Sequence, residues 1–94
     1  MNLASLLPIF KFRVQGESMS PTFKNGDKVL VNRFSYLLGK PKAGDIIVFK
    51  SDNKNIIKRI KKTEGDKSFV VGDKSGDFGW ILKKDIIGKV IYNL

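Results

Sequence analysis

The chain has 94 residues, of which 41% are hydrophobic, and 18 lysines and arginines against nine acidic residues give it a net charge of +9. It contains no cysteine and no histidine. This excludes disulfides, thiolate catalysis and a histidine general base, and it removes the usual ligands of zinc sites. The length and apolar content indicate one globular domain whose chemistry rests on hydroxyl, carboxylate or amino groups.

The N-terminal stretch MNLASLLPIFKF, residues 1–12, is apolar but is interrupted by Pro8 and Lys11. A membrane-spanning helix needs about 20 apolar residues, and a cleavable signal needs a positive n-region, which is missing. We therefore expect residues 1–12 to be a short apolar segment that packs on the core or dips into a membrane surface, and residues 13–94 to form the domain.

A Gly-Asp pair followed by an apolar run occurs three times, at Gly26–Val31, Gly44–Phe49 and Gly65–Val71. Glycine allows a positive φ, aspartate bonds its own backbone, and β-branched and aromatic residues suit a pleated surface, so each pair is expected to be a turn that leads into a strand. Three further apolar runs bring the expected strands to about six, typical of a barrel or sandwich. These runs are Phe10–Gln15, Asn55–Lys62 and Ile86–Asn93. The helical candidate is a turn or two within Asn32–Lys40.

The stretch GESMSPTFKNGD, residues 16–27, places Ser18 in a turn that contains Pro21 and is closed by a Gly-Asp pair. A serine hydroxyl acts as a nucleophile only beside a base. In a chain without histidine, a lysine can be that base if desolvation keeps its amine neutral. The alternative for Ser18 is an ordinary turn residue.

Strand alternation in NIIKRIKK nominates Lys58 as the base. The two faces carry Ile56, Lys58, Ile60 and Lys62 on one side and Ile57, Arg59 and Lys61 on the other. Lys58 has an isoleucine on each side along its own face, so it is the lysine expected to lose water. A lysine that extends its amine to solvent is the alternative.

Four blocks from Arg13 onward resemble the signal peptidase family, serine endopeptidases with a Ser-Lys dyad. They are SMSPT (Ser18–Thr22), PKAGDIIVF (Pro41–Phe49), IKRIKKTEGD (Ile57–Asp66) and, in contracted form, Val70–Val90. The resemblance implies a mostly β fold: a small twisted, partly open β-barrel with at most one short helix, the catalytic core of this Ser-Lys superfamily. Residues 13–94 are then the catalytic domain.

The same resemblance implies that Ser18 is the nucleophile and Lys58 the general base, the lysine that strand alternation also favours. The Ser18 N–H is expected to donate to the oxyanion, with a second donor near Gly16, where many members carry a serine. Loss of one such donor typically lowers the rate by about 10²–10³. A conformational requirement of the turn is the alternative explanation for Gly16.

Ser75 and Asp77 match the family's Ser-x-Asp, in which the serine orients the lysine. The block is shortened, however: Lys74 stands where the family has asparagine, and an arginine after the second aspartate is missing. A plain Gly-Asp hairpin is the alternative for this segment. Met19 and Pro21 are expected along the substrate cleft, whereas Phe23 is expected in the core.

The resemblance implies a membrane-associated or cytoplasmic serine endopeptidase that removes a signal or pro-peptide from a precursor protein, with no metal, cofactor or nucleic-acid partner. The chain resembles the minimal branch of the family, including small peptidases proposed to mature nickel-type superoxide dismutase precursors. Self-cleavage, as in SOS-response repressors, is disfavoured because no Ala-Gly or Cys-Gly precedes Ser18. The other alternative is a weakened or non-enzymatic basic β-module that binds nucleic acid or anionic membrane, with Phe34, Tyr36 and Trp80 as stacking platforms.

Overall fold

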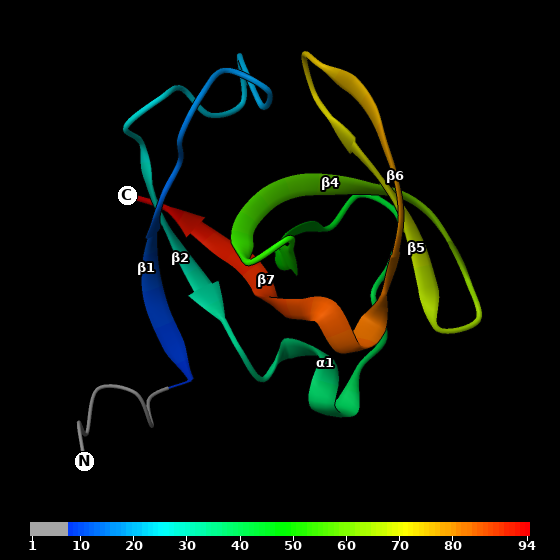
Figure 1. Ribbon diagram of the computed structural model, residues 1–94. Coiled ribbons are helices and arrows are strands. Elements are labelled where there is room, and N and C mark those ends of the chain that lie inside the picture. The colour runs from blue at the N-terminus through cyan, green and yellow to red at the C-terminus, as the bar shows by residue number, and fades with distance from the viewer. Residues whose placement is uncertain (1–7) are drawn as a thin grey trace.

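The computed structural model describes residues 8–94 and contains a single seven-stranded sheet in which all neighbouring strands are antiparallel (Figure 1). The strands are β1 (Ile9–Arg13), β2 (Lys28–Asn32), β3 (Ile46–Ser51), β4 (Lys54–Glu64), β5 (Lys67–Gly72), β6 (Gly76–Leu82) and β7 (Ile86–Asn93). Their order is β1-β2-β7-β3-β4-β5-β6, so the sheet is open and β1 and β6 are its edges. The expected mostly β fold is confirmed.

The expected strands are all present, but the count of about six missed β6. Gly76, Asp77 and Gly79 are of types depleted from strands, which hid the pattern. Pairing with β5 along the whole of β6 overrides this weak local preference. The expected Gly-Asp hairpin is therefore the β5–β6 connection, with its turn at residues 73–75.

The helical turn expected within Asn32–Lys40 is present. Helix α1 covers Ser35–Leu38 and ends where Gly39 adopts an extended backbone, and a 3-10 turn, η2, covers Lys83–Asp85. Within residues 8–94, neither of these segments is long enough to cross a membrane. The division expected between residues 12 and 13 falls inside β1, while residues 1–7 lie outside the described part of the chain.

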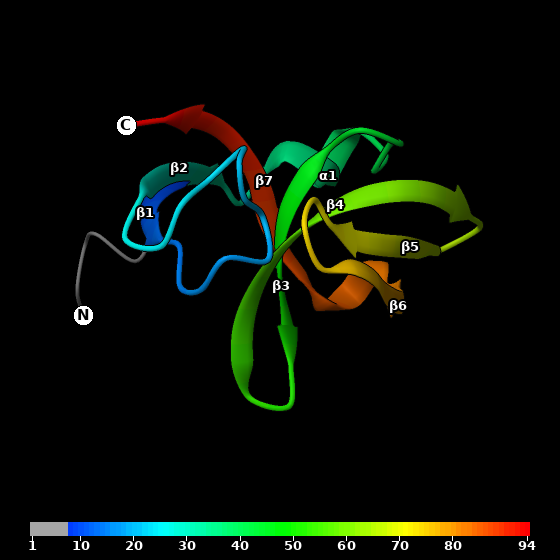
Figure 2. The same cartoon turned by 90° about the horizontal axis from the view of Figure 1, so that it is seen from above.

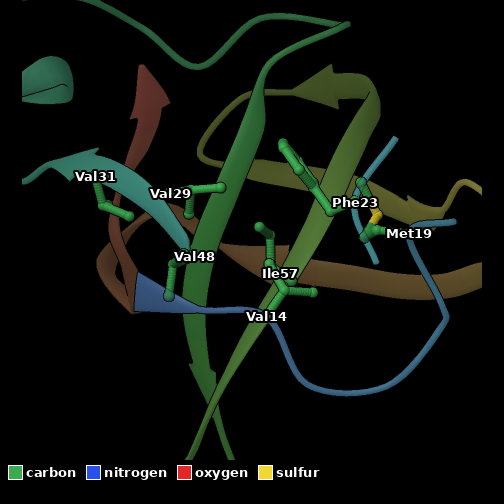
Figure 3. Packing of buried hydrophobic residues seen from close by; sticks show 7 residues of the cluster. All are labelled: Val14, Met19, Phe23, Val29, Val31, Val48 and Ile57. Carbon is green, nitrogen blue, oxygen red and sulfur yellow. The ribbon is translucent and has the colours of Figure 1, made fainter. Parts of the chain in front are cut away.

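Two hydrophobic clusters lie on opposite faces of the central strands β3 and β4. The first core cluster consists of Val14, Met19, Phe23, Val29, Val31, Val48 and Ile57 (Figure 3). The second core cluster consists of Ile47, Phe49, Ile60, Val70 and Ile81. Because side chains alternate along a strand, the apolar run of β3 sends Val48 to the first cluster and its two neighbours to the second. Strands β1 and β2 therefore cover one face of the central pair, and β5 and β6 cover the other (Figures 1 and 2).

A bulge in β4 separates Lys58 from Lys62. Ile60 lies opposite Val70 and Lys62 lies opposite Phe69, so the register shifts by one residue at Lys61. Cross-strand partners share a face, and Val70 and Phe69 point to opposite faces. Lys62 therefore lies on the face opposite to that of Ile60, and the expectation that it shares a face with Lys58 was wrong.

The two ends of the open sheet meet through a loop and a turn. The loop between β1 and β2 offers the carbonyl of Ser18 to the β5–β6 turn, where the backbone N–H groups of Lys74 and Ser75 donate to it at 2.8 and 3.4 Å. Figure 1 shows this loop and this turn at the same end of the molecule, away from α1. The open sheet is thus bridged at Ser18.

Candidate active site

Ser18 lies in a turn that the first core cluster holds in place. The Ser20 N–H donates to the Glu17 carbonyl at 3.0 Å, and the Phe23 N–H donates to the Met19 carbonyl at 2.9 Å. Met19 and Phe23 are buried side chains of the cluster. The turn is therefore anchored by two apolar residues while Ser18 itself stays partly exposed.

Lys58 lies on β4 opposite Ile47, and only 8% of its surface is exposed. Its Nζ is 2.7 Å from the Oγ of Ser18, within hydrogen-bond distance. The same nitrogen lies 5.9 Å from the ring centre of Phe78, a β6 residue that sequence reasoning missed. Burial lowers the pKa of Lys58 from its ordinary value of 10.5, because desolvation penalises the ammonium form.

An ion pair ties the lysine strand to the serine loop. The Nε and Nη2 of Arg59 each donate to one oxygen of Asp73 at 2.9 Å, and the hydroxyl of Thr22 donates to the same carboxylate. The hydrogen bonds from Arg59 hold the pKa of Asp73 below its ordinary value. The sequence did not predict these contacts among Arg59, Asp73 and Thr22. The available signal was that Arg59 follows Lys58 on the same strand, so its side chain points to the opposite face and is available to bind an acidic residue there.

Gly72 permits the turn to approach Ser18. A Cβ at this position would lie 2.7 Å from the carbonyl oxygen of Ser18 and 2.2 Å from the Oγ of Ser75. Both distances are shorter than a Cβ atom can approach another heavy atom without a clash, so any side chain at residue 72 would push the turn and the loop apart. Glycine is required at residue 72 because the backbone of the turn packs directly against the backbone of Ser18.

The residues expected to support the site, Gly16, Ser75 and Asp77, have different positions and contacts. Gly16 has a φ of +81°, and its N–H donates to the Oδ1 of Asn25 at 2.8 Å, so this N–H is already engaged. Ser75 contacts the Ser18 carbonyl through its backbone, and within residues 8–94 no hydrogen bond joins its hydroxyl to Lys58. Asp77 is exposed on β6 opposite Val71.

The expectation that Met19 lines the cleft needs correction. Met19 is fully buried in the first core cluster, because the turn points its side chain inward to anchor the loop. Pro21 is exposed and does not line the groove that contains Ser18 and Lys58. Phe23 lies in the core as expected.

A groove of about 580 Å³ contains both Ser18 and Lys58. One wall comes from the end of β1 and the residues after it, at Phe12, Arg13 and Gln15, and the other wall is Lys54–Lys58 of β4. Both walls are strand edges without a partner in the described chain: β1 pairs only with β2, and β5 pairs with β4 only from Arg59 onward. Unpaired edges present backbone N–H and C=O groups that another extended chain can bind.

Two of the three aromatic residues considered as stacking platforms, Tyr36 and Trp80, have other partners. The Tyr36 hydroxyl donates to Asp45 at 2.7 Å, and Trp80 packs edge-on against Phe69 with ring centres 5.3 Å apart. Phe34 is exposed just before α1. Among residues 8–94, no three acidic side chains gather where they could hold a metal ion.

A family model described as signal peptidase, peptidase S26, matches residues 2–75 of the chain. The chain belongs to the signal peptidase S26 family. It is 39% identical over 75 residues to a protein named signal peptidase I from Buchnera aphidicola subsp. Baizongia pistaciae, an alignment that covers 67% of this chain and 23% of that protein. It is also 39% identical over 57 residues to proteins named signal peptidase IB from Staphylococcus aureus strains Mu50 and N315, covering 60% of this chain and 30% of each relative. The chain thus matches only 23–30% of the length of these relatives.

Proposed function

We propose that this chain is a serine endopeptidase core in which Ser18 is the nucleophile and Lys58 the general base, and that it removes a signal or pro-peptide from a precursor protein. The observation that carries the proposal is the 2.7 Å separation of Lys58 Nζ and Ser18 Oγ. Membership of the signal peptidase family supports the same reaction class.

The burial of Lys58 suits it to the role of base. An ammonium group cannot accept a proton, so the lysine must be neutral when the substrate arrives. Its 8% exposure and its lowered pKa favour that neutral form. Neutral Lys58 accepts the hydroxyl proton as Ser18 Oγ forms a bond to the substrate carbonyl carbon.

The tetrahedral intermediate then collapses to an acyl-enzyme. The Ser18 N–H makes no hydrogen bond within the described residues and can donate to the developing oxyanion. The C–N bond breaks, and Lys58 passes its proton to the leaving amine. Lys58 next takes a proton from water, the resulting hydroxide attacks the ester, and Ser18 regains its proton as the acid product leaves.

The unpaired edges of the groove support an extended peptide as substrate. A peptide laid between the end of β1 and Lys54–Lys58 gains backbone hydrogen bonds as an added strand. This mode fixes the backbone direction, so one carbonyl carbon is held beside Ser18. The reaction then follows from positioning combined with a poised base.

The test is cleavage of a mixed peptide library, with products identified by mass spectrometry. We expect cleavage by the unmodified chain and its loss in Ser18→Ala and Lys58→Met, each of which removes one partner of the 2.7 Å pair. Lys62→Met is the matched control, because Lys62 lies on the same strand but on the opposite face and outside the groove.

Circular dichroism checks that each variant keeps the sheet. Cleavage that persists in folded Ser18→Ala or Lys58→Met would overturn the proposed mechanism. Equal loss in the Lys62→Met control would also count against it, because that change leaves the pair intact.

A further inference from the structure

The groove that contains Ser18 and Lys58 is lined by two more cations and no acid. Arg13 lies on the β1 wall and Lys54 on the β4 wall, and no aspartate or glutamate lines the groove. Both side chains are exposed, and neither forms an ion pair within residues 8–94. These two charges are free to meet a ligand.

The two cations point to the same side of the space where a strand would be added. Val14 and Ile57 meet in the first core cluster, as Figure 3 shows, and Phe12 packs against that cluster. Arg13 alternates with Phe12 and Val14 and therefore points away from the cluster. On β4, Lys54 alternates with Ile57 in the same way and shares the face of Lys58.

A bound strand alternates as well, so every second side chain points to the face that carries Arg13 and Lys54. Cross-strand neighbours on one face have Cβ atoms about 4.5–5.5 Å apart, within reach of an ion pair. Lys54 is four residues from Lys58, about 13 Å along the strand at 3.3 Å per residue. A side chain opposite Lys54 is therefore about four residues from the scissile bond.

We propose that the groove selects extended segments that carry an acidic side chain, about four residues from the scissile bond, on the face flanked by Arg13 and Lys54. This inference rests on the proposed function for the position of the scissile bond, whereas the binding preference itself rests on the groove. The side chains on the other face of the segment meet Phe12 and Ile57 and are expected to be apolar.

The expected preference is moderate because both cations are exposed. Single exposed ion pairs contribute about 0.2–1 kcal/mol, so two of them favour a glutamate over an alanine about twofold to thirtyfold at low salt. Screening shortens the range of both charges, so the preference should shrink at high ionic strength. A lysine at the same position is expected to bind more weakly than alanine.

Peptide binding to the full chain carrying Ser18→Ala tests the preference without cleavage. Fluorescence anisotropy is measured with labelled peptides in which glutamate, alanine or lysine is moved through successive positions. We expect glutamate to tighten binding at every second position of the peptide. Arg13→Gln and Lys54→Gln should reduce this preference for glutamate over alanine. Lys54→Glu should reverse the preference at the peptide position opposite residue 54. Lys61→Glu is the control, since it makes the same charge change on an exposed residue of the same strand outside the groove.

A preference that Lys61→Glu weakens as much as Lys54→Glu, or one without the two-residue period, would overturn the inference, because net charge alone would explain it. The same peptides are then offered to the unmodified chain. Cleavage without any charge preference overturns the inference and leaves the proposed function standing. A periodic acidic preference in binding without cleavage of any peptide supports the groove inference and overturns the proposed function.

Discussion

Two lysines of β4 lie at nearly the same distance from an aromatic ring and yet have different surroundings. Lys58 Nζ is 5.9 Å from the ring centre of Phe78, and Lys62 Nζ is 5.8 Å from that of Phe69. Lys58 is buried and bonded to Ser18, whereas Lys62 is exposed and lies above Phe69 and Trp80. The aromatic contact by itself therefore does not distinguish a candidate base from a surface lysine.

The difference comes from what each half of β4 pairs with. The half from Arg59 to Glu64 pairs with β5, and the bulge at Lys61 turns Lys62 outward. The half from Lys54 to Lys58 has an unpaired edge on that side, and the serine loop approaches it there. A gap in strand pairing thus creates both the groove and the space that the Ser18 hydroxyl reaches.

The largest expected effect concerns the protonation of Lys58. Because the pKa of Lys58 is lowered and the proposed mechanism requires the neutral amine, kcat/KM for peptide cleavage should rise with pH to a plateau, with a midpoint below 10.5. At pH values below the midpoint of the Lys58 titration, kcat/KM should fall about tenfold for each pH unit. A pH–rate profile measured over the range in which the sheet stays folded checks this, and a flat profile would count against Lys58 as the base.

Gly72→Ala should separate the serine loop from the lysine strand. The added methyl group meets the Ser18 carbonyl at 2.7 Å, and a shift of about 1 Å at a reacting group lowers rates by about 10²-fold. Gly88→Ala is the control, because its Cβ meets the Asn32 carbonyl at 2.6 Å, away from the groove.

Thermal unfolding and cleavage are measured for both glycine variants. Both should lose stability, and only Gly72→Ala should lose activity at temperatures where it is fully folded. Equal activity loss in the two folded variants would show that the clash at Ser18 has no special role.

Phe78→Ala exposes the Lys58 amine to water, which raises its pKa, and removes a cation–π contact with the ammonium, which lowers it. Because desolvation is the cause of the lowered pKa, we expect the net shift to be upward, toward 10.5. The midpoint of the pH–rate profile should move upward, and cleavage at neutral pH should fall by about the factor that the shift dictates, tenfold per unit. Phe69→Ala is the matched control, because it removes the ring beneath Lys62. If the midpoint of the pH–rate profile does not change in Phe78→Ala, then residues of β3 and β4, and not Phe78, keep water away from Lys58.

Asp73→Asn should weaken the hydrogen bonds that Arg59 and Thr22 make to residue 73 and destabilise the fold by about 1.5–3 kcal/mol, the range for hydrogen bonds to charged groups. The pKa of Asp73 is lowered by folding, so its contribution is present above its ordinary value of 3.8 and is lost as pH falls through the lower folded value. Urea unfolding at neutral and acidic pH checks this. The difference in free energy of unfolding between Asp73→Asn and the unmodified chain should become smaller at acidic pH.

Lys62→Met should have the smallest effect. Each of its two exposed cation–π contacts contributes about 0.5–1 kcal/mol, so the free energy of unfolding should fall by no more than about 2 kcal/mol while cleavage stays unchanged. Parallel urea unfolding and cleavage assays measure both. A marked loss of cleavage would mean that the second half of β4 takes part in catalysis.

Local patterns predicted most of the strands and favoured Lys58 among the lysines, whereas the family resemblance paired it with Ser18. The Gly-Asp turns and apolar runs located β2, β3 and β5, and the boundaries of β7 agree with the expected Ile86–Asn93. Alternation put Lys58 between Ile56 and Ile60, which the burial of Lys58 bears out. The same rule failed for Lys62, because a bulge depends on the partner strand and leaves no mark in the sequence of β4.

The sequence by itself determined the chemistry available to this protein. Without cysteine or histidine, any nucleophile and base must come from groups such as Ser18 and Lys58, and turn and strand propensities act over a few residues. Only the tertiary structure decided which groups meet: the contact of Arg59 with Asp73, the cover of Phe78 over Lys58 and the close approach at Gly72 join segments far apart in the chain. Such contacts depend on how the sheet twists until its ends meet, a property of all seven strands together.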